Sequence, residues 1–171
     1  MNIPYNALSH DEYNFIIKQS KLKNIPYGKT TMDQKGCGII ATYNAMKAAR
    51  MEPDFDDILS YFTKRAFMNG RFGSNAFQIS GYLRKFNLSN GYIFCKKNFN
   101  KVDIGILWYG HKQGYHYVAF YADKDGKFNF LNADEKKYPL VCTMDEFFKR
   151  YVKSKLCAVF VIKKVGDGKC L

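Results

Sequence analysis

The stretch that decides the fold is DQKGCGIIATYNAMKAAR, residues 33–50, in which a cysteine stands between two glycines at the start of a helical pattern. From Cys37 onward, apolar residues recur at helical spacing, and the alanines between them permit close packing. This pattern predicts a helix over residues 37–50 whose first turn carries a thiol. Free cysteines are among the most buried residue types, so an ordinary core cysteine is one interpretation. The alternative is that the helix activates the thiol of Cys37.

A helix N-terminus carries a partial positive charge, which favours the thiolate form in which cysteine is a nucleophile. Gly36 and Gly38 leave room for a substrate carbonyl to approach and for main-chain N–H groups to face its oxygen. The side-chain amide of Gln34, three residues before the cysteine, is a further candidate donor to that oxygen. Cys37 is therefore a candidate nucleophile, and Gln34 is a candidate oxyanion-site residue.

The rest of the first half of the chain has mainly helical patterns. We expect helices over residues 11–22, 37–50, 53–66 and 75–86, and a loop over residues 23–36. Pro53 suits the first turn of its helix, and Ser74 or Asn75 suits the N-cap of the next one.

After residue 90 the pattern changes to short β-branched and aromatic runs, which predict strands. These runs are GYIFCK (91–96), IGILWY (104–109), YHYVAFYA (115–122), KFNFLN (127–132) and CAVFVIKK (157–164). DKDG, residues 123–126, predicts a hairpin turn. Thr143 and Glu146 predict a capping box at the start of a helix over residues 143–154. Helices followed by an antiparallel sheet with one inserted helix predict an α+β fold with a cleft between its two parts.

The predicted hairpin supplies a candidate base for the thiol. His116 lies near the start of one strand and Asn132 ends the other, so a hairpin closed at residues 123–126 makes them neighbours in space. An imidazole whose tautomer is held by an adjacent amide is what a cysteine hydrolase requires. Taken singly, His116 is equally well explained as a partly buried histidine, and Asn132 as a turn residue. Their combination with Cys37 is what favours catalysis.

The helix-leading GCG, the strand HYVAFY and the strand end FLN resemble the papain-like cysteine peptidase superfamily. More narrowly, they resemble its compact bacterial branch, the peptidases that cleave bacteriocin leaders after double glycine, and their stand-alone relatives. The resemblance covers roughly residues 30–165. It implies a single papain-like domain over residues 1–171, with a helical part over about 10–88 and a sheet part over about 91–165.

The resemblance also implies roles for individual residues. Cys37 would be the nucleophile, His116 the general base and later acid, and Asn132 the orienting residue. Two positions depart from the family pattern. The oxyanion glutamine of the relatives usually stands where this chain has Thr31, so Gln34 fills that role only if the loop bends differently. The leader-processing relatives generally carry aspartate as the third member, which makes Asp134 an alternative to Asn132.

The function implied is a thiol hydrolase that cleaves a peptide or isopeptide bond in a protein or peptide substrate through an acyl-enzyme. Acyl transfer and glutamine deamidation use the same chemistry, and the sequence does not separate them from hydrolysis. A small basic domain of this kind suits a bacterial effector, toxin or processing peptidase. A non-catalytic domain that binds nucleic acid or another anionic partner is a hypothesis of a different class.

The charge of the chain bears on that last hypothesis. The sequence has 171 residues, with 27 Lys and Arg against 15 Asp and Glu, giving a formal net charge of +12. The lysines are scattered, and no specific nucleic-acid-binding motif is present, so a well-solvated surface is the better explanation of the charge.

The five cysteines have no CxxC spacing, so we expect neither a zinc site nor any other metal or cofactor. Cys95, Cys142 and Cys157 are expected in the core, and Cys170 at the surface. Reduced thiols and the lack of a signal-peptide pattern at the start indicate synthesis in the cytoplasm, so that export would need a specialised route. No apolar run is long enough for a membrane span. The oligomeric state is left open.

Overall fold

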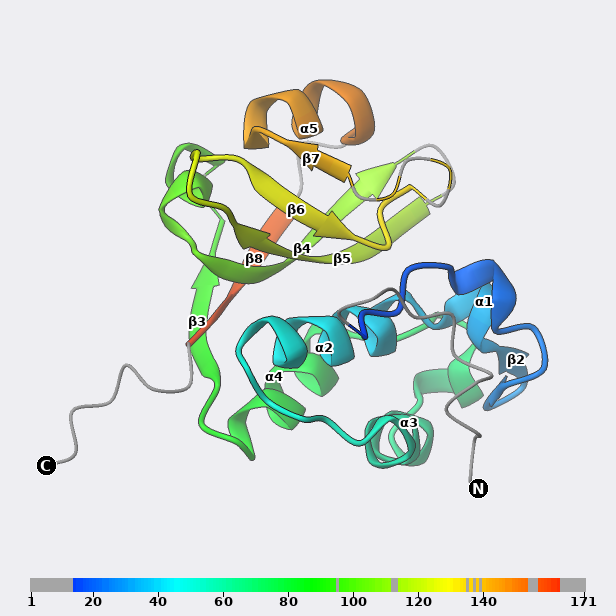
Figure 1. The fold of residues 1–171 in the computed structure, drawn as a ribbon. Helices are drawn as coiled ribbons and strands as arrows, with labels where there is room; N and C mark the ends of the chain where they lie inside the picture. The colour runs from blue at the N-terminus through cyan, green and yellow to red at the C-terminus, as the bar shows by residue number, and fades with distance from the viewer. Residues whose placement is uncertain are drawn as a thin grey trace, which may run out of the picture.

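The computed structural model describes residues 14–94, 96–111, 114–134, 136, 138, 140–153 and 157–163. Helices α1–α4 come first in the chain, and a six-stranded antiparallel sheet with one inserted helix follows (Figure 1). The predicted α+β arrangement is therefore confirmed. Cys95 and Cys170, for which burial and exposure were expected, lie outside the described residues.

The helices are α1 (Met32–Lys35), α2 (Cys37–Ala48), α3 (Phe55–Lys64), α4 (Ala76–Arg84) and α5 (Met144–Tyr151), with short 3-10 turns η2 (Gln19–Lys21), η3 (Phe67–Gly70) and η4 (Lys96–Lys101). The strands are β1 (Pro26–Tyr27), β2 (Thr30–Thr31), β3 (Ser89–Ile93), β4 (Ile104–His111), β5 (Gly114–Ala122), β6 (Phe128–Leu131), β7 (Leu140–Cys142) and β8 (Cys157–Ile162). The strand β7 has no counterpart among the predicted elements.

The predicted helix starts are largely confirmed, because local capping determines them. Asn75 caps α4, and its side chain and that of Gln78 bond each other's main-chain N–H groups as a capping box. Thr143 and Glu146 form the predicted capping box of α5. The start of α3 differs slightly from the prediction, since Asp54 is its N-cap and Pro53 precedes it.

The helix predicted over residues 11–22 is wrong for the part that the structure describes, where only the short η2 turn forms. Asn44 in α2 accounts for the difference. Its side-chain amide is fully buried, accepts a hydrogen bond from Ile16 N–H at 2.8 Å and donates one to Ile16 C=O at 2.8 Å. These two bonds take the main-chain groups that a helix would have used, so the apolar residues here are buried without forming one.

The loop predicted over residues 23–36 is wrong in part, because it contains the β1–β2 hairpin and α1. Tyr27 and Met32 are fully buried, which anchors both elements in the core. The hairpin turns at Gly28, whose φ is +63° and where an added Cβ would lie 2.1 Å from Asn69 O. Only glycine fits this approach.

The large sheet has the strand order β3-β8-β4-β5-β6-β7, with every pair antiparallel. β8, the last strand in the chain, lies between β3 and β4. The β5–β6 hairpin closes at residues 123–126, as predicted. β4 and β5 pair over their whole length, from Ile104 opposite Tyr121 to His111 opposite Gly114.

Side chains that alternate along the strands build a core on each face of the sheet. Ile104 and Ile106 face a core shared with α2, α3 and α4, whereas Leu107 and Tyr109 face a second core. In the second core, the ring of Phe147 from α5 stacks on Phe130 with centroids 3.9 Å apart. The sheet therefore lies between α5 on one side and the helical part on the other (Figure 1).

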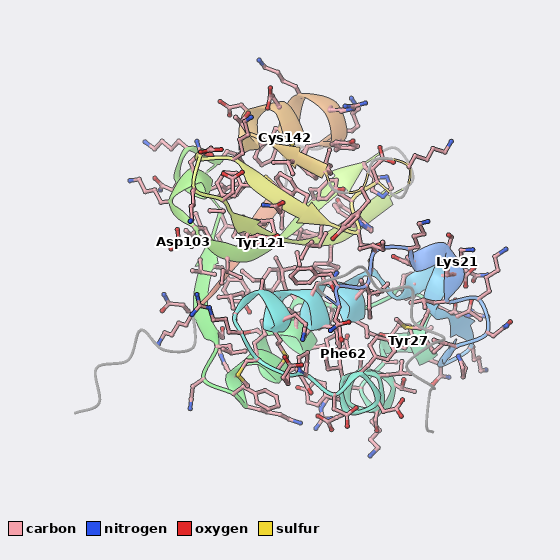
Figure 2. All side chains as sticks on the ribbon, in the orientation of Figure 1. Lys21, Tyr27, Phe62, Asp103, Tyr121 and Cys142 are labelled. Carbon is pink, nitrogen blue, oxygen red and sulfur yellow. The ribbon has the colours of Figure 1, made fainter. Side chains whose placement is uncertain are left out.

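The helix α2 is buried on nearly every side, from Gly38 to Met46. It lies between the sheet and the other helices, and β5 is its main neighbour in the sheet. Side chains such as Tyr121 on the sheet and the fully buried Phe62 in α3 fill the space around it (Figure 2). This packing fixes the N-terminal end of α2, and with it Cys37, against β5.

Candidate active site

Cys37 is the first residue of α2, as predicted, and Gly36 is the N-cap. The side chain is half-buried. Its thiol lies at the main-chain amides of Gly38, in the first turn of the helix, and of Tyr117, in β5. The sulfur therefore lies between the helix end and the strand that carries His116.

Burial raises the pKa of the Cys37 thiol, and the nearby amides of Tyr117 and Gly38 and the charge of Lys35 oppose only part of that rise. The resting thiol is accordingly protonated at neutral pH. We had expected the helix N-terminus to favour the thiolate, and it acts in that direction, but desolvation is the larger effect. Forming the thiolate requires a base that takes the proton directly.

His116 is half-buried on β5, and its ring contacts the main chain beyond β6. Its Nε2 lies 3.0 Å from the main-chain oxygen of Asn132. Since a carbonyl oxygen only accepts hydrogen bonds, Nε2 must carry the proton in the neutral ring, which leaves the lone pair on Nδ1. Burial lowers the pKa of His116, so the ring is neutral at neutral pH. A neutral imidazole with a free Nδ1 is a competent general base.

Asn132 is next to His116 as expected, but the contact differs from the expected one. The strand β6 ends at Leu131, and Asn132 has a φ of +65°, which turns its side chain away from the histidine. Its amide instead pairs with Gln19, through a bond from Gln19 N–H to Oδ1 at 3.2 Å and one from Nδ2 to Gln19 Oε1 at 3.2 Å. The main-chain carbonyl of Asn132, rather than its amide, therefore holds the imidazole.

Asp134, the alternative third member, does not contact His116. Its Oδ1 accepts a hydrogen bond from Lys136 N–H at 3.1 Å, and its Oδ2 accepts one from the hydroxyl of Tyr151 in α5 at 3.1 Å. Residues two apart point the same way only on an extended strand, and the left-handed residue at 132 interrupts the strand between Asn132 and Asp134.

Gln34 lies at the pocket but is exposed, and its Oε1 accepts a hydrogen bond from the Thr30 hydroxyl at 2.9 Å. The reason is that residues 32–35 form the helix α1, which places Gln34 one turn from Thr30 rather than over the thiol. The donors that the structure does place at the sulfur are main-chain amides, that of Tyr117 in β5 and those of Gly38 and Cys37 itself. The last two are the first N–H groups of α2, which have no acceptor within the helix.

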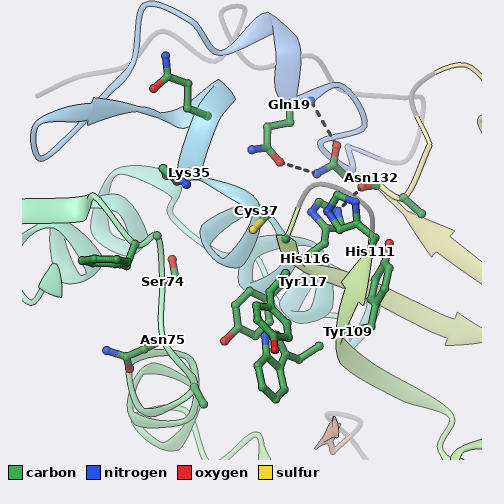
Figure 3. Close-up of a pocket in the computed structure, with 18 of the residues that line it drawn as sticks. Gln19, Lys35, Cys37, Ser74, Asn75, Tyr109, His111, His116, Tyr117 and Asn132 are labelled. Atoms are coloured by element: carbon green, nitrogen blue, oxygen red, sulfur yellow. Dashed lines mark hydrogen bonds between the residues drawn. The ribbon is translucent and has the colours of Figure 1, made fainter. Parts of the chain in front are cut away.

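The pocket around the thiol has a volume of about 900 Å³ and lies between the helical part and the ends of β4 and β5 (Figure 3). It is lined by Cys37, His116 and Asn132 and by several residues that the sequence patterns did not assign to the site. Those residues are Gln19, Ser74, Trp108, Tyr109 and Tyr117. His111 ends β4 and lines the same pocket, with its ring centroid 5.8 Å from that of His116.

Cys37 and His116 thus share one pocket, and no direct hydrogen bond joins them among the contacts of the described residues. Catalytic pairs are often this loose before substrate binds. Cys157 is buried in the second core, as expected, and Cys142 is half-buried beside it. Neither lines the pocket, so of the three cysteines that the structure describes, Cys37 is the one that lines it.

Within the described ranges, no group of three or more His, Cys, Asp or Glu residues is placed to hold a metal ion. None of the described helices has the length and apolar character needed to cross a membrane.

No protein-family model and no curated protein sequence matches the chain. Among solved structures, it is similar to the peptidase domain of Streptococcus ComA, described as a bifunctional ABC transporter involved in a quorum-sensing pathway. The TM-score is 0.53 and the sequence identity 12%, and the match covers 76% of this chain and 93% of that one. The likeness is one of fold, and it confirms the prediction of a papain-like α+β fold.

Proposed function

We propose that the protein is a thiol hydrolase that cleaves a peptide or isopeptide bond, with Cys37 as the nucleophile and His116 as the general base. The observation that carries the proposal is the shared pocket, in which the Cys37 thiol lies at the amide of Tyr117, the residue after His116. The ring Nε2 of His116 is already bonded to a carbonyl, so Nδ1 is the nitrogen left for the thiol. The fold shared with a peptidase domain agrees with this chemistry.

In the first half of the reaction, Nδ1 of His116 takes the thiol proton as the sulfur attacks the substrate carbonyl carbon. The carbonyl oxygen becomes an oxyanion, and the main-chain N–H of Cys37 and the N-terminal end of α2 stabilise its charge. When the intermediate collapses, the imidazolium returns its proton to the leaving amine. The acyl group then remains on the sulfur as a thioester.

In the second half, Nδ1 of His116 takes a proton from water as the water oxygen attacks the thioester carbon. When this intermediate collapses, the C–S bond breaks, the imidazolium returns its proton to the leaving sulfur, and the carboxylic acid and the free thiol are released. Throughout both halves, the carbonyl of Asn132 accepts a hydrogen bond from Nε2–H and holds the ring in one tautomer. A neutral carbonyl stabilises the imidazolium less than a carboxylate does, since charge-assisted hydrogen bonds are the stronger ones. Orientation, rather than charge neutralisation, is therefore the role that we assign to the third member.

The proposal is tested by incubating the protein with a panel of peptides that end in an electrophile and measuring the intact mass. We expect one adduct per molecule, mapped to Cys37, and its loss in His116→Ala. Cys142→Ser is the matched control, because Cys142 is a half-buried thiol outside the pocket. Adducts that map to Cys142, or labelling of Cys37 that is unchanged in His116→Ala, would contradict the proposal.

The same panel separates hydrolysis from acyl transfer and deamidation, which share the acyl-enzyme. Peptides without an electrophile are incubated with and without an added primary amine, and the products are identified by mass. Release of two fragments without amine supports hydrolysis. An amide product formed only with the amine, or the conversion of a glutamine side chain to glutamate, assigns the site to transfer or deamidation instead.

A further inference from the structure

Gln19 makes hydrogen bonds to both sides of the candidate site. Toward the sheet, its N–H donates to Asn132 Oδ1 and its Oε1 accepts from Asn132 Nδ2, each at 3.2 Å (Figure 3). Toward the helices, its Nε2 donates to Met32 C=O at 3.1 Å and to Asp33 C=O at 3.0 Å. Every polar atom of its side chain is thus used, and it lines the pocket beside Cys37.

On the sheet side, these contacts bear on His116 through Asn132. Asn132 is buried and has a φ of +65°, a conformation that is uncommon for residues other than glycine. Its side chain is held in this position by the two bonds to Gln19. The orientation of its side chain fixes that of its peptide group, whose carbonyl bonds Nε2 of His116. Gln19 therefore acts on the base through one intermediate residue.

On the helix side, the contacts bear on Cys37 through α1. Met32 and Asp33 form the first turn of α1, and the same Met32 carbonyl accepts a hydrogen bond from Gly36 N–H at 2.9 Å. Gly36 is the N-cap of α2, and Cys37 follows it directly. The amide of Gln19 thus fixes the turn that leads into the helix of the nucleophile.

A glutamine side chain suits this position better than its close relatives. It supplies one acceptor and two donors, which match Asn132 Nδ2 and the two carbonyls of α1. Glutamate would remove both donors and place a carboxylate against those carbonyls. Alanine would leave Asn132 Nδ2 and the Asp33 carbonyl without these partners in a partly buried place.

We propose that Gln19 is a positioning residue that sets the relative placement of Cys37 and His116, an inference that rests on the function proposed above. It does not touch the reacting atoms, and it acts by fixing Asn132 on one side and α1 on the other. The N-terminal segment would then be required for the geometry of the site as well as for the core.

The test compares Gln19→Ala and Gln19→Glu with Lys21→Ala, an exposed residue in the same η2 turn that does not line the pocket. Two readouts do not depend on peptide cleavage. Long-range ¹H–¹⁵N NMR reports which ring nitrogen of His116 carries the proton, and iodoacetamide reports the reactivity of Cys37 across pH. We expect both Gln19 variants to lose the uniform Nε2–H tautomer and to alkylate about 10- to 100-fold more slowly near pH 7, with Lys21→Ala unchanged.

The proposal is overturned if the Gln19 variants melt at a lower temperature and yet keep the tautomer and the alkylation profile of the unaltered protein. That result would show that Gln19 is merely structural. Asn132→Gly gives a second route if the Gln19 variants do not fold, because glycine keeps the positive φ and the carbonyl but removes the amide that Gln19 holds. We expect the same tautomer change there, and an unchanged tautomer overturns the proposal. If the unaltered protein cleaves no peptide while the tautomer depends on Gln19, the hydrolase proposal fails and the positioning role stands.

Discussion

The thiol side and the imidazole side of the pocket are built in different ways. Cys37 is placed by residues next to it in the chain, with Gly36 as the N-cap and Gly38 in the same helical turn. His116 is placed by the residue that follows the partner strand, Asn132, which is itself held by Gln19, 113 positions away. The position of Cys37 in its helix therefore follows from local structure, and packing against β5 then holds that end of the helix in place. The placement of His116 depends throughout on contacts that form only when the whole chain is folded.

This difference shows where the site is robust and where it is fragile. The helix α2 is buried on nearly all sides, and packing of that kind tolerates little movement of the backbone. The imidazole is held by a hydrogen bond to a main-chain carbonyl and by edge-to-face contacts with the rings of Tyr109 and His111. Substitutions on the thiol side should mainly change stability, whereas substitutions on the imidazole side should mainly change the protonation and orientation of the base.

The largest expected effect comes from removing either member of the pair. We expect Cys37→Ala and His116→Ala each to lower kcat/KM for a cleaved peptide by about 10³-fold or more, and the double variant to lose little further, since the two groups act as a unit. Cys142→Ala, outside the pocket, should keep its activity. Steady-state kinetics on folded variants checks this, and a double variant whose losses multiply would show that the two residues act separately.

The next largest effect tests how tightly the thiol side is packed. In Gly38→Ala the new Cβ would lie 2.5 Å from Ser74 Cβ and 3.4 Å from Tyr117 Cδ2. We expect the variant to lose about 1–3 kcal/mol of unfolding free energy, because the overpacking outweighs the better helix propensity of alanine. Denaturant unfolding measures this loss.

Two further variants control the Gly38 prediction. Ser74→Gly in the Gly38→Ala background removes the atom that clashes and should restore most of the lost stability. Gly81→Ala in α4 is matched for secondary structure, and only the hydroxyl of Tyr61, at 2.7 Å, obstructs the new Cβ. Because the end of a half-buried side chain can move, Gly81→Ala should cost less, and an equal cost at both glycines would argue against a tightly packed thiol side.

The features that the sequence predicted correctly are those with local causes. The start of α2 follows from the Gly36–Cys37–Gly38 stretch, and the start of α5 from the reciprocal bonds of Thr143 and Glu146. His116 and Asn132 lie close together because a turn of four residues closes the hairpin that joins them. In each case the residues that decide the structure lie within one element or one turn of it.

The features that the sequence did not predict depend on distant partners. Asn44 prevents a helix at Ile16, 28 residues before it, by bonding both of its main-chain groups. Nothing in the spacing of Gln19 indicates that it pairs with Asn132. The role of the Asn132 carbonyl was not predicted for a similar reason. Sequence periodicity indicates where side chains point on a regular strand, but it carries no information on a left-handed residue that follows the strand.

A smaller effect compares the two capping boxes, one in each half. Asn75→Ala at α4 and Thr143→Ala at α5 should each cost about 1 kcal/mol of unfolding free energy, the usual value for an N-cap. Their effects on peptide cleavage should differ, because Asn75 lines the pocket, whereas Thr143 lies in the sheet half outside it. Activity measured at a temperature where both variants are folded checks this, and equal activities would show that the start of α4 does not shape the site.

The smallest effect at neutral pH concerns the charge of the two histidines. Burial lowers the pKa of both His111 and His116 below the ordinary value of 6.5. Below that pH the unfolded chain binds more protons than the folded one, so stability falls as the pH is lowered from about 6.5 through the folded pKa values. The melting temperature should therefore decrease between about pH 7 and pH 5, and His116→Gln should flatten part of that decrease.

The thiol side should have the opposite pH dependence. Burial raises the pKa of Cys37 above its ordinary value of 9.0, so the stability that comes from the neutral thiol is present below pH 9.0 and is lost as the pH rises further. Cys37→Ala should flatten part of the alkaline decrease, to which the raised pKa values of Cys157 and Tyr109 also contribute, and should leave the acidic decrease. His116→Gln should flatten part of the acidic decrease and leave the alkaline one. Melting curves of the two variants across pH separate the contributions of Cys37 and His116 to stability. If each variant changed both the acidic and the alkaline decrease, the two groups would titrate as one coupled pair. The base would then be linked to the nucleophile more tightly than the separate construction of the two sides implies.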